Sequence, residues 1–167
     1  QWLAHALALS GDAVPDPLRA DALLSSGLLA NHAGDHAAAT SFADQAARLA
    51  ADTQQPALHG RACTTMGFCA IAAGDVARGI LLCERGVDLL RPTGDRWGLA
   101  DALHFLGHAQ ADQTGLESAR AAWDESLRLF RELGDAWSQA QPLKDLGLIA
   151  ARAGDHVAAR VLYEDSL

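Results

Sequence analysis

The chain is short of features that several functional classes require. Lysine occurs once, as Lys144, and 13 Lys and Arg stand against 21 Asp and Glu, giving a formal net charge of −8. A surface of this sign repels a phosphate backbone, so we expect no nucleic acid as a partner of this segment. Aromatic residues make up only 5% of the chain, whereas Ala is abundant. This composition favours close-packed helices over sheets.

Cysteines and long apolar runs are also scarce. Cys63, Cys69 and Cys83 are odd in number and form no C-x-x-C pair, so we predict buried free thiols in a cytoplasmic protein. Every apolar run is interrupted before the roughly 18 residues of a membrane span, and no signal peptide is recognisable. We therefore expect no membrane partner. Because the chain begins at Gln1 and ends at Leu167 within an amphipathic pattern, we expect a fragment of a longer protein.

Motifs of common enzymes are absent from the sequence. There is no G-x-x-x-x-G-K loop, no G-x-G-x-x-G, no G-x-S-x-G and no locally supported pairing of a cysteine with a histidine. The sequence therefore favours a binding protein over an enzyme. We expect neither catalytic residues nor a cofactor.

A period of 40 residues organises the whole chain. Written in rows of that length, four glycines fall in one column, each within an apolar helical stretch where Gly costs about 1 kcal/mol relative to Ala. We predict that at each of them a second helix crosses so closely that no side chain fits. The four are Gly27, Gly67, Gly107 and Gly147.

Two kinds of turn divide each row into two helices. In the first kind, glycine ends one helix in the left-handed conformation and aspartate caps the next. This pattern is present at Gly34-Asp35, Gly74-Asp75 and Gly154-Asp155, but the third row has Thr114-Gly115, so its turn should differ. The second kind, between rows, carries Gly94-Asp95, Gly134-Asp135 and the prolines Pro15, Pro17, Pro56 and Pro92.

The turns fix the expected architecture, which is a single all-α domain over residues 1–167. Residues 1–13 should end a preceding repeat, and the repeats proper should span 14–53, 54–93, 94–133 and 134–167. First helices are predicted at 17–33, 56–73, 95–112 and 135–153. Second helices are predicted at 35–51, 75–91, 115–133 and 155–167.

One proline and three tryptophans call for separate predictions. Pro142 falls about seven residues inside the last first helix, where it removes a backbone hydrogen bond, so we predict a kink or a late start of that helix. Trp97 and Trp137 share one column and Trp123 lies in the column of small and aromatic residues. All three are interpreted as packing residues rather than as parts of a ligand cage.

The segment L-G-L-I-A-A-R-A-G-D-H-V-A-A-R-V-L-Y at 146–163 resembles the tetratricopeptide repeat (TPR). HEAT and armadillo repeats have periods near 40 and the usual TPR period is 34, but the glycine column and the small and aromatic columns here are those of the TPR. The resemblance implies helix-turn-helix repeats stacked into a right-handed superhelical solenoid. In the fourth row the matching columns hold Leu143, Leu146, Gly147, Ala150, Ala159, Tyr163 and Ser166.

Two further stretches carry a narrower resemblance. The segments at 91–100 (R-P-T-G-D-R-W-G-L-A) and 129–137 (L-F-R-E-L-G-D-A-W) are similar to the long repeats of bacterial LuxR-type and antibiotic-regulatory signal-transduction ATPases. This resemblance implies a module of a transcriptional or signalling regulator that binds a protein partner or a small effector. The parent chain would have an NTPase module before the repeats and a DNA-binding domain at one end.

The resemblance also implies that residues of the first helices off the core stripe line a concave face, here called the predicted inner face. Its mixture of apolar groups and both charge signs suits a protein or peptide partner, or other domains of the parent chain. Self-association and an ordinary solvated surface remain alternatives. By row, the residues are Asp21, Leu24, Leu28, Asn31 and His32; Arg61, Thr64, Phe68 and Ile71; Asp101, His104, Phe105, His108 and Asp112; Lys144, Asp145, Leu148 and Arg152.

The sharpest local pattern is Asp101, His104, His108 and Asp112, whose spacing places all four on one helical face. Two histidines four residues apart can ligate a metal, and a metal-dependent enzyme centred on His104 and His108 is the outside alternative. A zinc protease motif would need Glu where Phe105 stands. We therefore expect no metal site but a polar inner surface, with a pH-sensitive contact as a further alternative.

Overall fold

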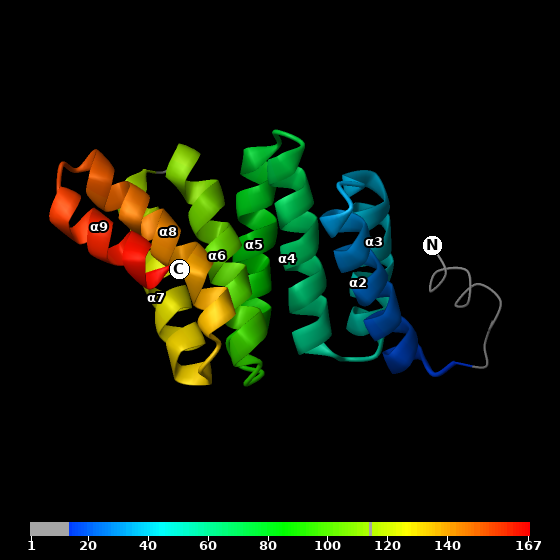
Figure 1. The fold of residues 1–167 in the computed structure, drawn as a ribbon. Helices are drawn as coiled ribbons and strands as arrows, with labels where there is room; N and C mark the ends of the chain where they lie inside the picture. The colour runs from blue at the N-terminus through cyan, green and yellow to red at the C-terminus, as the bar shows by residue number, and fades with distance from the viewer. Residues whose placement is uncertain (1–13, 114) are drawn as a thin grey trace. The chain divides into compact units, whose positions relative to one another are not determined.

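The computed structural model describes residues 14–113 and 115–167, apart from the side chain of Asp112, and these residues form eight α-helices and no strand (Figure 1). Residues 1–13, predicted to end a preceding repeat, lie outside the described residues. The chain divides into two compact units, unit 1 (Gln1–Asp95) and unit 2 (Arg96–Leu167). Each unit is described by itself.

Unit 1 holds α2 (Asp16–His32), α3 (His36–Asp52), α4 (Pro56–Ala72) and α5 (Val76–Leu90). Unit 2 holds α6 (Arg96–Gln113), α7 (Leu116–Leu133), α8 (Ala136–Arg152) and α9 (His156–Asp165). Each boundary lies within two residues of its predicted position. The alternation of first and second helices is therefore confirmed.

The turns within rows follow the predicted chemistry. Gly34 has φ +77°, and the carboxylate of Asp35 accepts a hydrogen bond of 3.0 Å from the amide of Ala38 in the first turn of α3. The same arrangement recurs after Gly74 and Gly154. The third row differs as expected, because Gly115 itself is the N-cap of α7, with φ +102° and no side-chain hydrogen bond.

The glycine column marks the points where paired helices cross, as predicted. A Cβ atom built on Gly67 would lie 2.6 Å from Cys83 Sγ, and one built on Gly147 would lie 2.8 Å from a ring carbon of Tyr163. At Gly27 the nearest atom would be the Ala39 carbonyl oxygen at 3.3 Å. The residues that face the four glycines share one column of the repeat: Ala43, Cys83, Trp123 and Tyr163.

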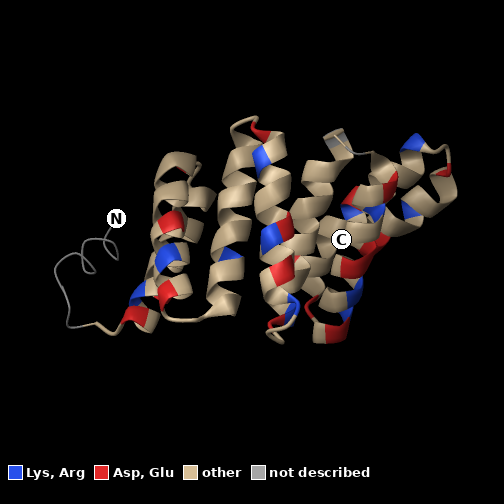
Figure 2. Cartoon of the chain, turned by 180° about the vertical axis from the view of Figure 1, so that it is seen from behind, with Lys and Arg blue, Asp and Glu red and all other residues tan. Residues whose placement is uncertain are grey.

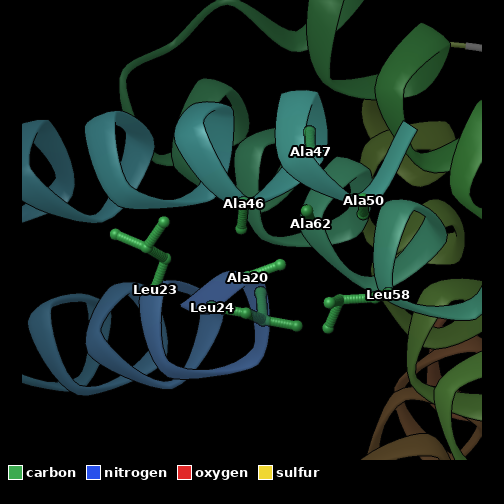
Figure 3. Close-up of a cluster of buried hydrophobic side chains, with 8 residues drawn as sticks. All are labelled: Ala20, Leu23, Leu24, Ala46, Ala47, Ala50, Leu58 and Ala62. Atoms are coloured by element: carbon green, nitrogen blue, oxygen red, sulfur yellow. The ribbon is translucent and has the colours of Figure 1, made fainter. Parts of the chain in front are cut away.

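Small residues let three helices of unit 1 share one core (Figure 3). From α3, Ala46 and Ala50 face α2 and α4 with no exposed surface. Because alanine keeps the helix axes close, the leucines of α2 and α4 fill the remaining space, and each buried leucine contributes about 2 kcal/mol. The cluster consists of Ala20, Leu23, Leu24, Ala46, Ala47, Ala50, Leu58 and Ala62.

Unit 2 builds its core around larger side chains. Trp123 and Leu127 of α7 pack with Leu143 and Leu146 of α8. Pro142, adjacent to this cluster, is fully buried inside α8, and the helix runs unbroken from Ala136 to Arg152. The predicted late start of this helix is therefore wrong, because packing of the proline ring offsets the missing hydrogen bond. A kink at Pro142 stays a prediction.

The three cysteines are free and buried, as predicted, and all belong to unit 1. Burial raises the pKa of the Cys63 and Cys69 thiols, so both stay protonated at neutral pH. Among the described helices, none combines the length and the apolar character that a membrane crossing needs.

Candidate functional site

The structure sorts the predicted inner-face residues by their accessibility. Leu24 belongs to the core of unit 1, and the hydroxyl of buried Thr64 donates to the Gly60 carbonyl oxygen at 3.1 Å. Together with His104 and Asp145, these residues are buried and not open to a partner, which corrects the prediction for them. The side chain of Asp112 is outside the described part. Exposed are Asp21, Leu28, His32, Arg61, Lys144, Leu148 and Arg152, and half-buried are Asn31, Phe68, Ile71, Asp101, Phe105 and His108.

Unit 1 contains a groove of about 780 Å³ at the beginnings of α2 and α4, beside the turn that follows α5. Two predicted inner-face residues, Asp21 and Arg61, lie in its wall. Leu18 is exposed in the groove despite its apolar side chain, at 63% of its full surface. The lining comprises Pro17, Leu18, Asp21, Gln54, Gln55, Pro56, Ala57, Leu58, Arg61, Pro92, Thr93 and Asp95.

The charged residues of this groove are held in place by a bidentate ion pair. The Arg61 guanidinium donates from Nε and from a terminal nitrogen to the two carboxylate oxygens of Asp95, at 2.5 and 2.8 Å. Such a fork geometry fixes both side chains. Arg61 is also the only formally charged residue of α4, whereas both charge signs are interspersed along other helices (Figure 2). The groove therefore has apolar walls with a fixed polar edge.

A cluster of titratable side chains lies inside unit 2. His104 Nε2 is 3.0 Å from Asp145 Oδ2, His108 Nε2 is 3.1 Å from the same oxygen, and the two Nε2 atoms are 3.1 Å apart. The histidines come from α6 and the carboxylate comes from α8. The His104 and Asp145 side chains are 10% and 8% exposed, whereas His108 is 41% exposed.

Burial and hydrogen bonding fix the charges of this cluster. Burial lowers the pKa of His104, and the hydrogen bond with Asp145 opposes this shift only in part. Burial would raise the pKa of the Asp145 carboxyl, but hydrogen bonds from His104 and His108 outweigh it and hold that pKa well below its ordinary value. At neutral pH the cluster therefore contains an ionised carboxylate beside a neutral His104 imidazole.

Trp123 sets the position of both histidines. Its indole Nε1 donates to the His104 carbonyl oxygen at 3.0 Å, and the His108 ring meets the indole edge-on at a centroid distance of 5.4 Å. The sequence placed the two histidines on one face, which is confirmed, but grouped them with Asp101 and Asp112. Asp145, 41 residues after His104, is a carboxylate that meets them and that the spacing did not reveal. A search for acidic residues one row further along could have found it.

The tryptophans divide into two groups. Trp123 is 4% exposed and is the packing residue that the sequence predicted. Trp137 is 84% exposed, so its prediction as a packing residue is wrong. Trp97 is partly exposed, and its Nε1 donates to the Asp135 carboxylate at 3.0 Å. The two members of the shared column thus differ in exposed fraction, 42% for Trp97 and 84% for Trp137.

Comparisons with known proteins identify the fold. The chain is similar to the crystal structure of BtubC (BKLC) from P. vanneervenii, with a TM-score of 0.77 and 18% identity over 98% of this chain and 67% of that one. It is also similar to a putative kinesin light chain from Podospora anserina with nearly identical TPR-like repeats, with a TM-score of 0.67 and 15% identity over 98% of this chain and 82% of that one. The fold is TPR-like.

This result confirms the all-α repeat predicted from the glycine and turn columns and the TPR-like fold that the resemblance implied. No protein-family model and no curated protein sequence matches the chain. At sequence identities of 18% and 15%, the similarity to these two structures concerns the fold alone.

Proposed function

We propose that the chain is a protein-binding repeat module that holds a short segment of a partner protein in the groove of unit 1. The observation that carries the proposal is an exposed apolar lining, including Leu18 and three prolines, beside the fixed Arg61–Asp95 pair. A groove of about 780 Å³ accommodates several residues of an extended peptide. The Asp21 carboxylate and the Arg61–Asp95 pair supply polar groups that orient such a segment.

The chemistry of the groove favours a polypeptide over other ligands. Apolar walls reward burial of leucine-like or proline-like side chains, whereas the acidic net charge disfavours nucleic acid. Binding would depend on contacts of Leu18 with the partner. In repeat folds each row contacts only its neighbouring rows. The helix faces that are not buried between rows therefore stay accessible to a partner.

The test is selection of peptides from a display library on the purified chain, followed by binding measurements on two variants. Leu18→Asp should weaken the selected peptides about 10-fold or more, because a buried apolar contact becomes a desolvated charge. Leu81→Asp is the matched control, since Leu81 is 66% exposed on α5 and lies outside the groove lining. Equal loss in both variants, or no loss in Leu18→Asp, would refute the groove as the site.

We further propose that the parent protein is a bacterial transcriptional or signalling regulator in the cytoplasm. The support is the resemblance of residues 91–100 and 129–137 to the repeats of LuxR-type signal-transduction ATPases. The parent open reading frame tests this directly. An NTPase module upstream or a DNA-binding domain at one end is the expected result, and a frame that encodes neither would contradict it.

A structural role in self-association is the second candidate. It is favoured by α9, where Val157 is 70% exposed and Tyr163 and Leu167 border a hollow of about 520 Å³. Sedimentation velocity over a range of concentrations distinguishes the candidates. A dimer that dissociates in Val157→Asp supports self-association, and a monomer at all concentrations excludes it for this chain.

A further inference from the structure

Three potential metal ligands form a nearly equilateral triangle in unit 2. The corners are Nε2 of His104, Nε2 of His108 and Oδ2 of Asp145, and the edges measure 3.0, 3.1 and 3.1 Å. No other group of three such side chains with ligand atoms this close occurs among the described residues.

Hydrogen bonds alone do not account for all three edges. A neutral imidazole Nε2 carries either one hydrogen or one lone pair, so it either donates or accepts. If both rings donate to Asp145, the two Nε2–H groups face each other without an acceptor. If His104 accepts from His108, it has no hydrogen left for Asp145. One short edge therefore always lacks a hydrogen bond, whereas a cation near the centre would use a lone pair from every corner.

The repeat itself does not require these residues. In the other rows, the column of His104 holds Leu24, Thr64 and Lys144, and the column of His108 holds only apolar side chains. Packing of first helices is thus achieved without histidine. A buried carboxylate is also costly unless it is well paired, so two histidines and an aspartate at one point need a reason other than the fold. The column of Asp145 holds Ser25, Thr65 and Phe105.

The dimensions of the triangle suit a metal ion. Ligands at about 2.1 Å from a metal lie about 3.0 Å apart when their bonds are at right angles and about 3.4 Å apart in a tetrahedron. The observed edges are closest to the first value. Two imidazoles and one carboxylate on one face are a donor set of Zn²⁺, Co²⁺, Ni²⁺, Mn²⁺ and Fe²⁺, whereas Ca²⁺ and Mg²⁺ prefer oxygen alone.

We propose that His104, His108 and Asp145 bind one divalent transition-metal ion, with Zn²⁺ as the reference ion, and so join α6 to α8. His108, which is 41% exposed, leaves one side of the site open to solvent. The remaining coordination positions are filled by water. Trp123 holds the site in shape from behind, through the His104 carbonyl and the His108 ring. The proposal is independent of the groove in unit 1.

The experiment is a titration of the purified, metal-free, untagged chain with ZnSO₄ in competition with a chromophoric chelator. One Zn²⁺ per chain is expected, and His108→Ala should weaken binding about 100-fold or more, since loss of a ligand exceeds the 10- to 100-fold effect of an outer-shell change. Asp145→Asn should do the same. His156→Ala is the matched control, because this exposed histidine of unit 2 lies outside the cluster, and its affinity should stay within about twofold of the parent chain.

A second measurement separates ligation from nonspecific binding. Zn²⁺ on Nε2 leaves the hydrogen on Nδ1, so ¹⁵N imidazole spectra should show His104 and His108 converting to the Nδ1–H tautomer at one equivalent of metal. Circular dichroism checks the fold of each variant, and if Asp145→Asn unfolds, His108→Ala and the tautomer spectra decide. Zn²⁺ affinity unchanged in a folded His108→Ala, or no Zn²⁺ bound at 1:1, would overturn the proposal.

Discussion

The helix pairs α4/α5 and α6/α7 occupy equivalent rows but fill their crossings differently. In α4/α5, glycines stand on both helices, and a Cβ built on Gly86 would lie 3.1 Å from the Gly60 carbonyl oxygen. In α6/α7, the indole of Trp123 covers Gly107. The glycine column therefore marks where two helices cross, whereas the residue opposite decides what fills the crossing, which is either an aromatic ring or small side chains with close backbone atoms.

The same difference appears in the sequence, because the column that holds Trp123 and Tyr163 in the later rows holds Cys83 in the second row. Gly79 takes the place of the usual small residue, and a Cβ there would lie 3.2 Å from the Gly67 carbonyl oxygen and closer still to Ile71. Smaller side chains and close backbone atoms of the two helices replace one aromatic side chain. The second row thus keeps its helix pairing without a large residue, because both of its helices carry glycine where they cross.

Removing the aromatic filling should have the largest effect on stability. Trp123→Ala would leave a cavity over Gly107 and remove a buried hydrogen bond, so we expect a loss of about 3–5 kcal/mol in the free energy of unfolding. Tyr163→Ala serves as the comparison, because Tyr163 covers Gly147 but is 36% exposed. Its loss should be about 1–2 kcal/mol. Urea denaturation followed by circular dichroism measures both, and equal losses would contradict the aromatic-filling model.

Adding one carbon to the backbone contact should have a smaller but clear effect. In Gly67→Ala the new Cβ meets Cys83 Sγ at 2.6 Å and two backbone atoms at 3.2 Å, so overpacking should cost about 2 kcal/mol. Adding Cys83→Ala removes the sulfur but not the backbone atoms. The double variant should therefore recover less than the full loss. Complete recovery in thermal unfolding would show that side chains, not backbone, set the helix spacing in this row.

The first row should tolerate the same substitution. A Cβ on Gly27 would lie 3.3 Å from the Ala39 carbonyl oxygen and 3.5 Å from its other neighbours. The gain in helix propensity from Gly to Ala is about 1 kcal/mol and offsets this mild crowding. Gly27→Ala should change the free energy of unfolding by less than about 1 kcal/mol. A loss as large as that of Gly67→Ala would show that crowding at the crossing is the same in both rows.

The turns that begin the second and third rows offer the finest comparison. Gln54 has φ +55° at the position where the third row has Gly94, with φ +77°. A side chain in this left-handed region costs about 1 kcal/mol, which is partly offset by the greater freedom of unfolded glycine. Gln54→Gly should raise the stability by about 0.5 kcal/mol. A differential scanning measurement in which Gly94→Gln shifts the midpoint in the opposite direction would support this account, and a decrease in Gln54→Gly would refute it.

The fold could be predicted from the sequence because the signals of its helices and turns are local and repeated. A glycine in a helix, a Gly-Asp turn and a period of 40 residues each depend on nearby backbone geometry, and repetition makes them visible. The predicted late start of α8 at Pro142 was wrong, because the burial of the proline ring depends on the packing of unit 2 and not on the local sequence.

Only part of the candidate site could be predicted from the sequence, because some of its residues meet through packing between helices. The spacing of His104 and His108 predicts that they share one helix face, whereas Asp145 lies beside them only because α6 packs against α8. The groove combines the beginnings of two helices with a turn from the following row, and no single segment shows it. Trp137 shares a column with Trp97 yet is 84% exposed against 42%, because periodicity gives the position of a side chain but not the extent to which neighbours cover it.

The hydrogen bond from Trp97 to Asp135 has a consequence for dissecting the protein. Asp135 is the N-cap of α8, and its carboxylate accepts hydrogen bonds from the Ser138 amide and from the indole of Trp97 on α6. The first turn of one row is therefore secured by a side chain from the row before it. A polypeptide of α8 and α9 alone would lack the hydrogen bond from Trp97, so we expect the first turn of α8 to fray in it. The smallest piece of unit 2 worth expressing therefore contains both rows.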